Sequence, residues 1–117
     1  MNIQVNKHQL ERVVIKWLDK HFGDLIPKKH KDHPESVFYV NSNNKVMIEL
    51  DQNNGGAWVN YDYIWARIES LFHVNYDEIT QIMKVWFEDV YNFEGVTPYS
   101  GRGHGRFRWK ELTNWTD

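Results

Sequence analysis

The spacing of apolar residues changes twice along this chain, from helical to strand-like and back to helical. These changes limit the fold classes that the chain can adopt. From residue 6 to 22 they recur every three or four positions, which predicts an amphipathic helix. From residue 37 to 60 they form short runs that alternate with polar residues and turn formers, which predicts strands. Helical spacing returns after residue 60. The predicted buried stripes are Leu10, Val13, Val14, Trp17, Leu18 and Phe22; then Ile64, Ile68, Leu71 and Phe72; then Ile79, Ile82, Met83, Trp86, Val90 and Phe93.

The pattern predicts a small single α+β domain with an N-terminal helix, a three-stranded antiparallel meander, two further helices and a C-terminal edge strand. We expect strands at 37–40, 45–50 and 57–60, with a last strand at 105–109. In the second of these, Val46, Ile48 and Leu50 alternate with other residues and are predicted to share one covered face. The opposite face, which carries Glu49, is predicted to be exposed to solvent. Trp17 and Trp86 stand in the middle of their stripes and are predicted to be fully buried.

Helix ends and loops carry recognisable signals. Asn6 suits the N-cap of the first helix, and Gly23 suits a left-handed residue just past its end. Residues 59–62 and 74–77 repeat the word Val-Asn-Tyr-Asp, whose aspartates or asparagines are predicted to cap the two later helices. Residues 28–33 are polar and lie between two prolines, so they are predicted to form a solvated loop.

Composition narrows the class of protein. A chain of 117 residues with 18 aromatic side chains has the length and the apolar content of one domain. We expect a core at 1–98 and a segment at 99–117 that belongs to the same domain. The chain has no cysteine, no N-terminal apolar signal core and no long apolar run, so we expect a cytoplasmic protein without membrane contact. Eleven asparagines, nine lysines and eight isoleucines against two alanines are typical of a phage or an A/T-rich bacterium.

Positive charge is concentrated near the C-terminus. Residues 1–98 carry 10 Lys/Arg and 14 Asp/Glu, whereas residues 99–110 carry four Lys/Arg and no acid. Guanidinium groups bind phosphates or carboxylates in bidentate fashion, and the interleaved rings can stack or pack. The predicted binding residues are Arg102, His104, Arg106, Phe107, Arg108, Trp109 and Lys110.

Motifs for catalysis or cofactors are weak throughout. His30 and His33 have no evident third metal ligand, and the calcium-like spacing after Asp51 lacks an oxygen ligand at its fifth position. Ser100 beside His104 has no orienting acid, and the alternating glycines of 101–105 do not have the spacing of a phosphate loop. Glu49 with Asp51 is the one carboxylate pair on a strand. We therefore expect no metal, no cofactor and no assigned catalytic residue.

Three functions remain open at this point. The first is a non-enzymatic domain that docks on or inhibits another protein, favoured by the acidic body and the arginine-rich segment. The second is a single-stranded nucleic-acid binder that uses the same segment, although a pI near 6.3 is low for a basic nucleic-acid surface. The third is a small hydrolase. The sequence assigns no oligomeric state.

Overall fold

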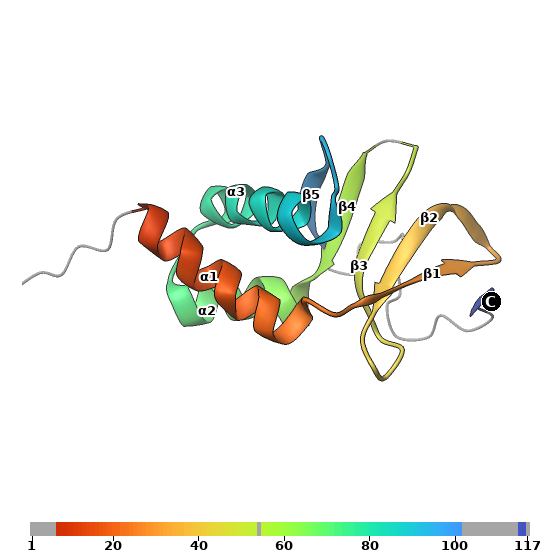
Figure 1. Cartoon of the computed structure of the whole chain (residues 1–117), viewed down its shortest axis with the longest axis horizontal. Helices are drawn as coiled ribbons and strands as arrows, with labels where there is room; N and C mark the ends of the chain where they lie inside the picture. The colour runs from red at the N-terminus through yellow and green to blue at the C-terminus, as the bar shows by residue number, and fades with distance from the viewer. Residues whose placement is uncertain (1–6, 54, 102–114, 117) are drawn as a thin grey trace, which may run out of the picture.

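The fold is built on one mixed sheet with helices over one of its faces (Figure 1). The computed structural model describes residues 7–53, 55–101 and 115–116. The first four strands form an antiparallel meander, whereas β5 pairs with β4 in parallel after the chain has passed through the helices. Spatial strand order is β5-β4-β3-β2-β1-β6. The strands are β1 Ile26–His30, β2 His33–Val40, β3 Val46–Asp51, β4 Gly56–Asn60, β5 Thr97–Gly101 and β6 Trp115–Thr116.

The predicted α+β architecture is confirmed, and the C-terminal edge strand is present as β6. The meander has one strand more than predicted. Residues 28–33, predicted to form a loop, belong instead to β1, β2 and the tight turn between them. The prediction was wrong because it was based on side-chain polarity alone. Strand β1 lies near the edge of the sheet, where lysine side chains reach water while their backbone groups form hydrogen bonds with the neighbouring strand. The predicted strand at 105–109 lies outside the described residues.

Helix α1 spans Lys7–Phe22, as its apolar spacing predicts, and buries Val14 and Leu18 completely. Its end differs from the prediction. Gly23 does not have a positive φ. A Cβ at this position would lie 2.5 Å from the Asp19 carbonyl oxygen, so the close approach of the two backbones requires a glycine here.

The two later helices each include a π-helical turn. Asn60 accepts a hydrogen bond from the Tyr63 N–H, and Asn75 forms a reciprocal capping box with Glu78. The asparagines, not the aspartates, are therefore the capping residues of the repeated word. The helical elements are η1 Tyr61–Trp65, α2 Ala66–Phe72, α3 Tyr76–Trp86 and η2 Phe87–Tyr91.

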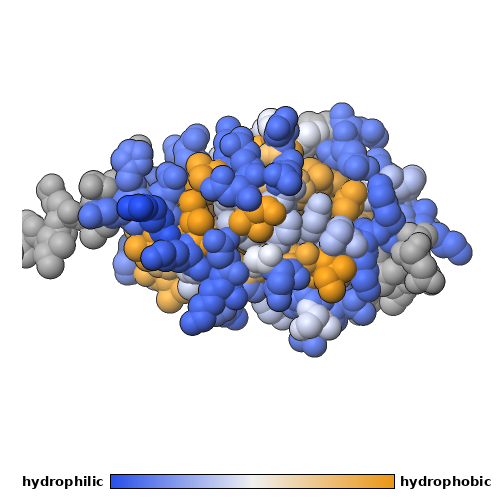
Figure 2. Space-filling view, viewed as in Figure 1, coloured by the Kyte–Doolittle hydropathy of each residue, from blue (hydrophilic) through white to orange (hydrophobic). Residues whose placement is uncertain are grey.

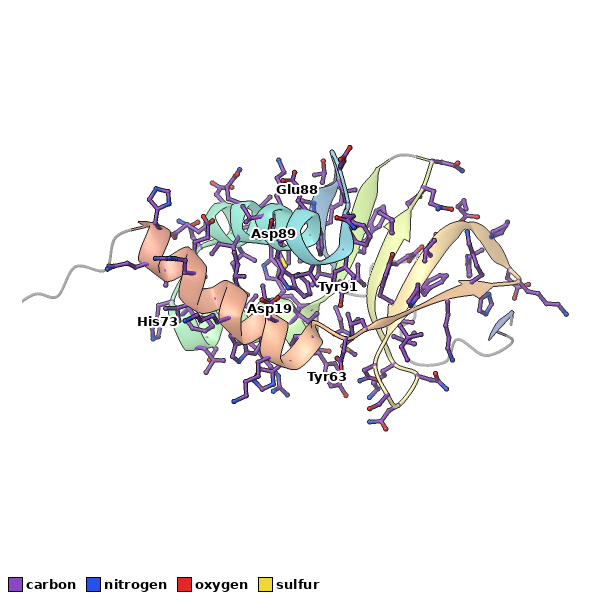
Figure 3. All side chains as sticks on the ribbon, viewed as in Figure 1. Asp19, Tyr63, His73, Glu88, Asp89 and Tyr91 are labelled. Atoms are coloured by element: carbon purple, nitrogen blue, oxygen red, sulfur yellow. The ribbon has the colours of Figure 1, made fainter. Side chains whose placement is uncertain are left out.

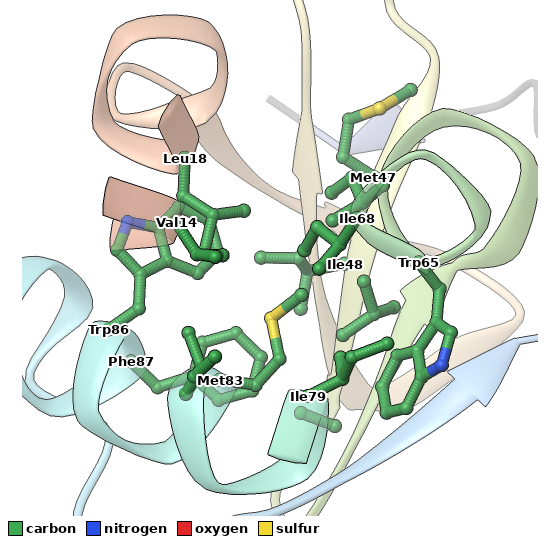
Figure 4. Packing of buried hydrophobic residues seen from close by; sticks show 14 of the residues in the cluster. Val14, Leu18, Met47, Ile48, Trp65, Ile68, Ile79, Met83, Trp86 and Phe87 are labelled. Carbon is green, nitrogen blue, oxygen red and sulfur yellow. The ribbon is translucent and has the colours of Figure 1, made fainter. Parts of the chain in front are cut away.

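The main core lies between the helices and the sheet (Figure 4). Trp86 is 0% exposed and its indole N–H donates to the Asp19 carboxylate at 3.0 Å, so its predicted burial is confirmed. Trp17 is only partly buried, because its ring packs at the margin of the core against Phe72, 6.1 Å away. Leu71 is 57% exposed, so its place in the predicted stripe is also wrong. Only Ile68 of the short helix α2 is fully buried.

Candidate binding face of the sheet

One row of side chains crosses five neighbouring strands on the side of the sheet that faces away from the helices. Strand register sets Phe38 of β2 opposite Glu49 of β3, and Glu49 opposite Trp58 of β4. Lys28 of β1 and Tyr99 of β5 extend the row at its two ends. Directly paired residues project to the same side of a sheet. We call this side the second face; it also carries Ser36, Asp51 and Thr97 in the neighbouring row.

Tyr39 fixes the orientation of the two faces. Its ring lies 5.1 Å from that of Tyr91 and 5.2 Å from that of Phe93, both on the helix side. Successive strand residues point to opposite sides, so Phe38 projects away from the helices. The second face is therefore distinct from the surface that packs against α1, α2 and α3.

A bulge adds one more apolar side chain to the second face. The sequence predicts Val46 on the same side as Ile48, but the register between β2 and β3 shifts between Tyr39 and Val40. An extra residue in one strand interrupts the alternation of sides. Val46 therefore packs with Phe38 and Val40 on the second face, while its neighbour Met47 belongs to the helix-side core.

The second face is not exposed to solvent, contrary to the prediction. Glu49 is 0% exposed and Asp51 is 2% exposed. Phe38 and Ser36 are also fully buried. A cluster that combines apolar rings with two carboxyl groups beneath the surface is unusual, because Asp and Glu side chains are seldom fully buried.

Hydrogen bonds hold both carboxylates in place. The Ser36 hydroxyl donates to Glu49 Oε2 at 2.5 Å across the β2–β3 pair. Asp51 Oδ1 accepts from the backbone N–H of Asn53 at 2.9 Å, which fixes the turn into β4. These hydrogen bonds give both carboxyl groups a structural role within the sheet.

His30 and His33 meet across the β1–β2 turn. Their ring centroids are 5.2 Å apart, and each ring lies edge-on to Phe38, at 6.2 Å and 5.9 Å. His30 is 5% exposed, and its Nδ1 accepts from the Asp32 N–H at 3.1 Å. The structure therefore brings together the two imidazoles that the sequence analysis considered as a pair of metal ligands. Within the described ranges, no group of three or more metal-ligating side chains is found.

Trp58 and Tyr99 form the accessible end of the row. Their rings stack at a centroid distance of 5.4 Å with an interplanar angle of 29°. Tyr99 is 43% exposed, whereas Trp58 is partly buried against the Phe38 cluster. Because β5 is an edge strand, this stacked pair presents aromatic surface at a border of the sheet.

The residues that the sequence predicts for binding, Arg102 to Lys110, lie outside the described residues. Their attachment points are described, however. The segment begins directly after Gly101 of β5, which pairs with Asn60, and β6 resumes at Trp115, which pairs with His30. Residues 102–114 therefore link opposite edges of the sheet.

Tyr91 joins the helical layer to the start of β1 (Figure 3). Its hydroxyl donates to the Phe22 carbonyl oxygen and accepts from the Leu25 N–H at 3.3 Å. Burial, together with the nearby Asp24 and Asp19 carboxylates, raises the pKa of Tyr91 to about 12. Burial also raises the pKa of Tyr39. Both phenols are therefore neutral hydrogen-bonding groups of the core and not general bases near neutral pH.

The helix-side surface offers less to a partner. Val13, Leu71 and Tyr76 are about half exposed, at 51%, 57% and 48%. In the view of Figure 2, apolar side chains stand in small groups interrupted by hydrophilic ones. Isolated exposed apolar residues are normal on a soluble domain. The helices of the described part of the chain are also too short or too polar to cross a bilayer.

Sequence reasoning missed Ser36, Trp58 and Tyr99 as members of one surface. The signal was present in part: Glu49 and Asp51 were recognised as a pair on one side of a strand. Their neighbours depend on the register of β2, β4 and β5 against β3, which no local pattern specifies.

Comparison with known proteins provides no relative. The chain matches no family model, no curated protein and no solved structure. Function must therefore be argued from the residues themselves.

Proposed function

We propose that this chain is a small non-enzymatic binding domain that docks on or inhibits another protein. The observation that carries the proposal is the stacked Trp58–Tyr99 pair at the border of the second face. Tyr99 stands three residues before Arg102, where the basic segment begins. Exposed aromatic rings beside arginines are the composition that dominates the binding energy of protein interfaces.

The partner surface that suits these residues is acidic with apolar pockets. Arginine binds carboxylates through two parallel hydrogen bonds, and an aromatic anchor supplies buried area at low entropic cost. The proposed contact residues in the segment are Arg102, His104, Arg106, Phe107, Arg108, Trp109 and Lys110.

Segregated charge supports a guided encounter. Residues 1–98 have a net charge of −4 and residues 99–110 a net charge of +4. Such a separation orients the domain in the field of an acidic partner and repels that partner from the remaining surface. We further propose, on composition alone, a cytoplasmic protein of phage type.

A single-stranded nucleic-acid binder is the second candidate, favoured by the same stacked rings. Bases stack on exposed aromatic side chains, and nearby arginines contact phosphates. The protein partner ranks first because an acidic body repels the rest of a polyanionic strand. A hydrolase has the least support, since the carboxylate pair Glu49 and Asp51 is buried.

Charge reversal tests the proposal. We expect Arg106→Glu with Arg108→Glu to abolish capture of a protein partner from lysate, because two repulsive charges replace two attractive ones. Lys16→Glu with Lys20→Glu, at two exposed positions of α1, makes the same change in net charge elsewhere and should retain capture. Circular dichroism and thermal unfolding confirm that each variant is folded.

Nuclease treatment and salt separate the two candidates. A protein partner stays bound after nuclease treatment, whereas a nucleic-acid ligand is lost. Affinity for a mixed-sequence oligonucleotide that falls steeply with salt would favour the second candidate. Equal capture by the reversed and the control variants would contradict the role given to the basic segment.

A further inference from the structure

Two exposed cations contact one tyrosine ring where the helix layer meets the turn between β2 and β3 (Figure 3). The Lys45 ammonium donates a hydrogen bond to the Tyr63 hydroxyl at 2.7 Å, and its nitrogen lies 4.9 Å from the centroid of that ring. The guanidinium carbon of Arg67 lies 6.0 Å from the same centroid. We call these three side chains the Tyr63 cluster.

Neither cation of the Tyr63 cluster forms an ion pair. Within the part of the chain that the structure describes, the side-chain contacts of Lys45 and Arg67 are those with Tyr63. Asp62 is next to Tyr63 along the chain and is exposed, but it pairs with neither cation. A hydroxyl and a ring face bring no full negative charge to a cation. Residues 1–98 carry 14 Asp/Glu against 10 Lys/Arg, so this local excess of positive charge is unusual for the body of the chain.

A buried asparagine connects the two backbone segments that carry the cluster. Asn60 is 6% exposed, and its Oδ1 accepts from the Tyr63 N–H at 3.1 Å. Its Nδ2 donates to the Val46 carbonyl oxygen at 3.0 Å. Because Val46 directly follows Lys45, one side chain ties the start of β3 to the start of η1.

The turn that precedes β3 fixes Lys45 from the other side. Asn41 Oδ1 accepts from the backbone N–H of Lys45 at 3.0 Å and from that of Asn43 at 2.9 Å. The Asn41 N–H donates to the Lys45 carbonyl oxygen at 3.0 Å. Both backbone polar groups of Lys45 are thus bonded within the turn. Binding groups that a rigid backbone already positions lose less entropy when a ligand arrives.

We propose that the Tyr63 cluster is a binding site for a phosphate dianion, either free or as the terminal group of a phosphate monoester. A monoester carries close to two negative charges near neutral pH, which matches the two cations. Its oxygens accept from an ammonium, from the fork of a guanidinium and from a phenol O–H. Tyr63 accepts from Lys45, so its own proton is available to the ligand. A carboxylate brings one charge and two oxygens and satisfies the cluster less well.

A titration of the full chain with inorganic phosphate tests the site, with amide chemical shifts as the readout. Sodium chloride keeps the ionic strength constant, so the shifts report phosphate and not salt. We expect saturable shifts at Lys45, Tyr63 and Arg67 and smaller ones on α1. Acetate is the carboxylate comparison and should bind at least ~10 times more weakly. Shifts that chloride reproduces, or equal affinity for acetate, would overturn the proposal.

Substitutions assign the binding to these side chains. Lys45→Gln and Arg67→Gln should each weaken phosphate affinity about tenfold, because each removes one charged donor. Tyr63→Phe keeps the ring and should weaken affinity less, since it removes a single neutral donor. Lys20→Gln makes the same charge change at an exposed position of α1 and should retain affinity. Thermal unfolding confirms that each variant is folded. Equal effects of Lys45→Gln and Lys20→Gln would overturn the site in favour of general electrostatic attraction.

A nucleoside monophosphate, titrated in the same way, separates the two sources of phosphate. Equal affinity for this compound and for inorganic phosphate would support a site for free phosphate. Tighter binding of the monophosphate, with further shifts outside the Tyr63 cluster, would support a site for a monoester. The lack of saturable shifts with both compounds would overturn the proposal.

This inference does not rest on the proposed partner or on the basic segment. Loss of partner capture by the charge-reversed variant, with phosphate binding intact, would support both proposals. Phosphate binding without any response of capture would contradict only the proposed function. A response of capture without phosphate binding would contradict only the proposed phosphate site.

Discussion

On the helix side of the sheet, Ile48 and Val59 lie among apolar side chains from all three helices, whereas on the second face Phe38 lies beside the buried acids Glu49 and Asp51. Both faces exclude water, but they do so with different chemistry. Apolar packing depends on volume and tolerates repacking, while a buried carboxylate requires donors in fixed directions. The second face is therefore the more specific of the two, because its buried acids require hydrogen-bond donors in fixed directions.

The largest expected effect tests the helix-side core. Trp86→Ala should lower the free energy of unfolding by about 3–5 kcal/mol, because it leaves a large cavity and removes the hydrogen bond to Asp19. Trp17→Ala, at the partly exposed margin, should cost clearly less. Urea unfolding of both variants measures the difference. Similar losses for the two tryptophans would show that the margin of the core is packed as tightly as its centre.

Phe38→Ala makes the corresponding test on the second face. We expect a loss of about 3 kcal/mol, near the lower end of the range for a buried phenylalanine, because Phe38 is as buried as Trp86 but smaller. The same urea titration provides the value. A loss below about 1 kcal/mol, the usual effect of a substitution outside any packed core, would show that the second face is covered loosely and is not a second core.

Ser36→Ala isolates the polar part of the second face. The substitution removes the donor to Glu49 Oε2 and almost no volume, so it should cost about 1–3 kcal/mol. Ser36→Thr is the matched control, because it keeps the hydroxyl and changes only the volume of the side chain. If alanine and the native serine gave the same stability, the Ser36–Glu49 hydrogen bond would contribute nothing net.

The smallest expected effect is a loss of stability at high pH, caused by Tyr91 on the helix side of the sheet. Burial raises the pKa of Tyr91 to about 12 from its ordinary value of 10.0, so the native state keeps this proton where the unfolded chain loses it. Stability from Tyr91 is present in full below pH 10 and declines as the pH rises toward 12. Tyr91→Phe should flatten this decline in denaturant midpoints measured across that interval. An unchanged slope in the variant would assign the decline to other groups.

Local sequence patterns predicted the elements well where one periodicity dominates. The spacing of Val14 and Leu18 predicted the buried side of α1 and its end at Phe22, and the asparagine of each repeated word caps its helix. The patterns failed where pairing outweighs composition. The polar stretch 28–33 became strand because β2 supplied a partner for its backbone, which side-chain polarity does not reveal.

The candidate site was predicted only in fragments. Glu49 and Asp51 were seen to share a side of their strand, since alternation alone specifies that. Their burial was not foreseen, because burial depends on what lies over a strand and not on the strand itself. The proposed contact residues of the segment 102–110 remain a prediction from charge and aromatic content.

The sequence by itself determined the α+β class, the positions of the helices and of β2 to β4, and the separation of an acidic body from a basic segment. These follow from periodicity, capping residues and charge, all of which act over a few positions along the chain. Only the tertiary structure decided that β1 joins the meander and that β5 and β6 end on opposite edges of the sheet. It also aligned Phe38, Glu49, Trp58 and Tyr99 in one row. The physical reason is that register and strand order arise from pairing between distant residues, whose cost and reward appear only when the whole sheet assembles.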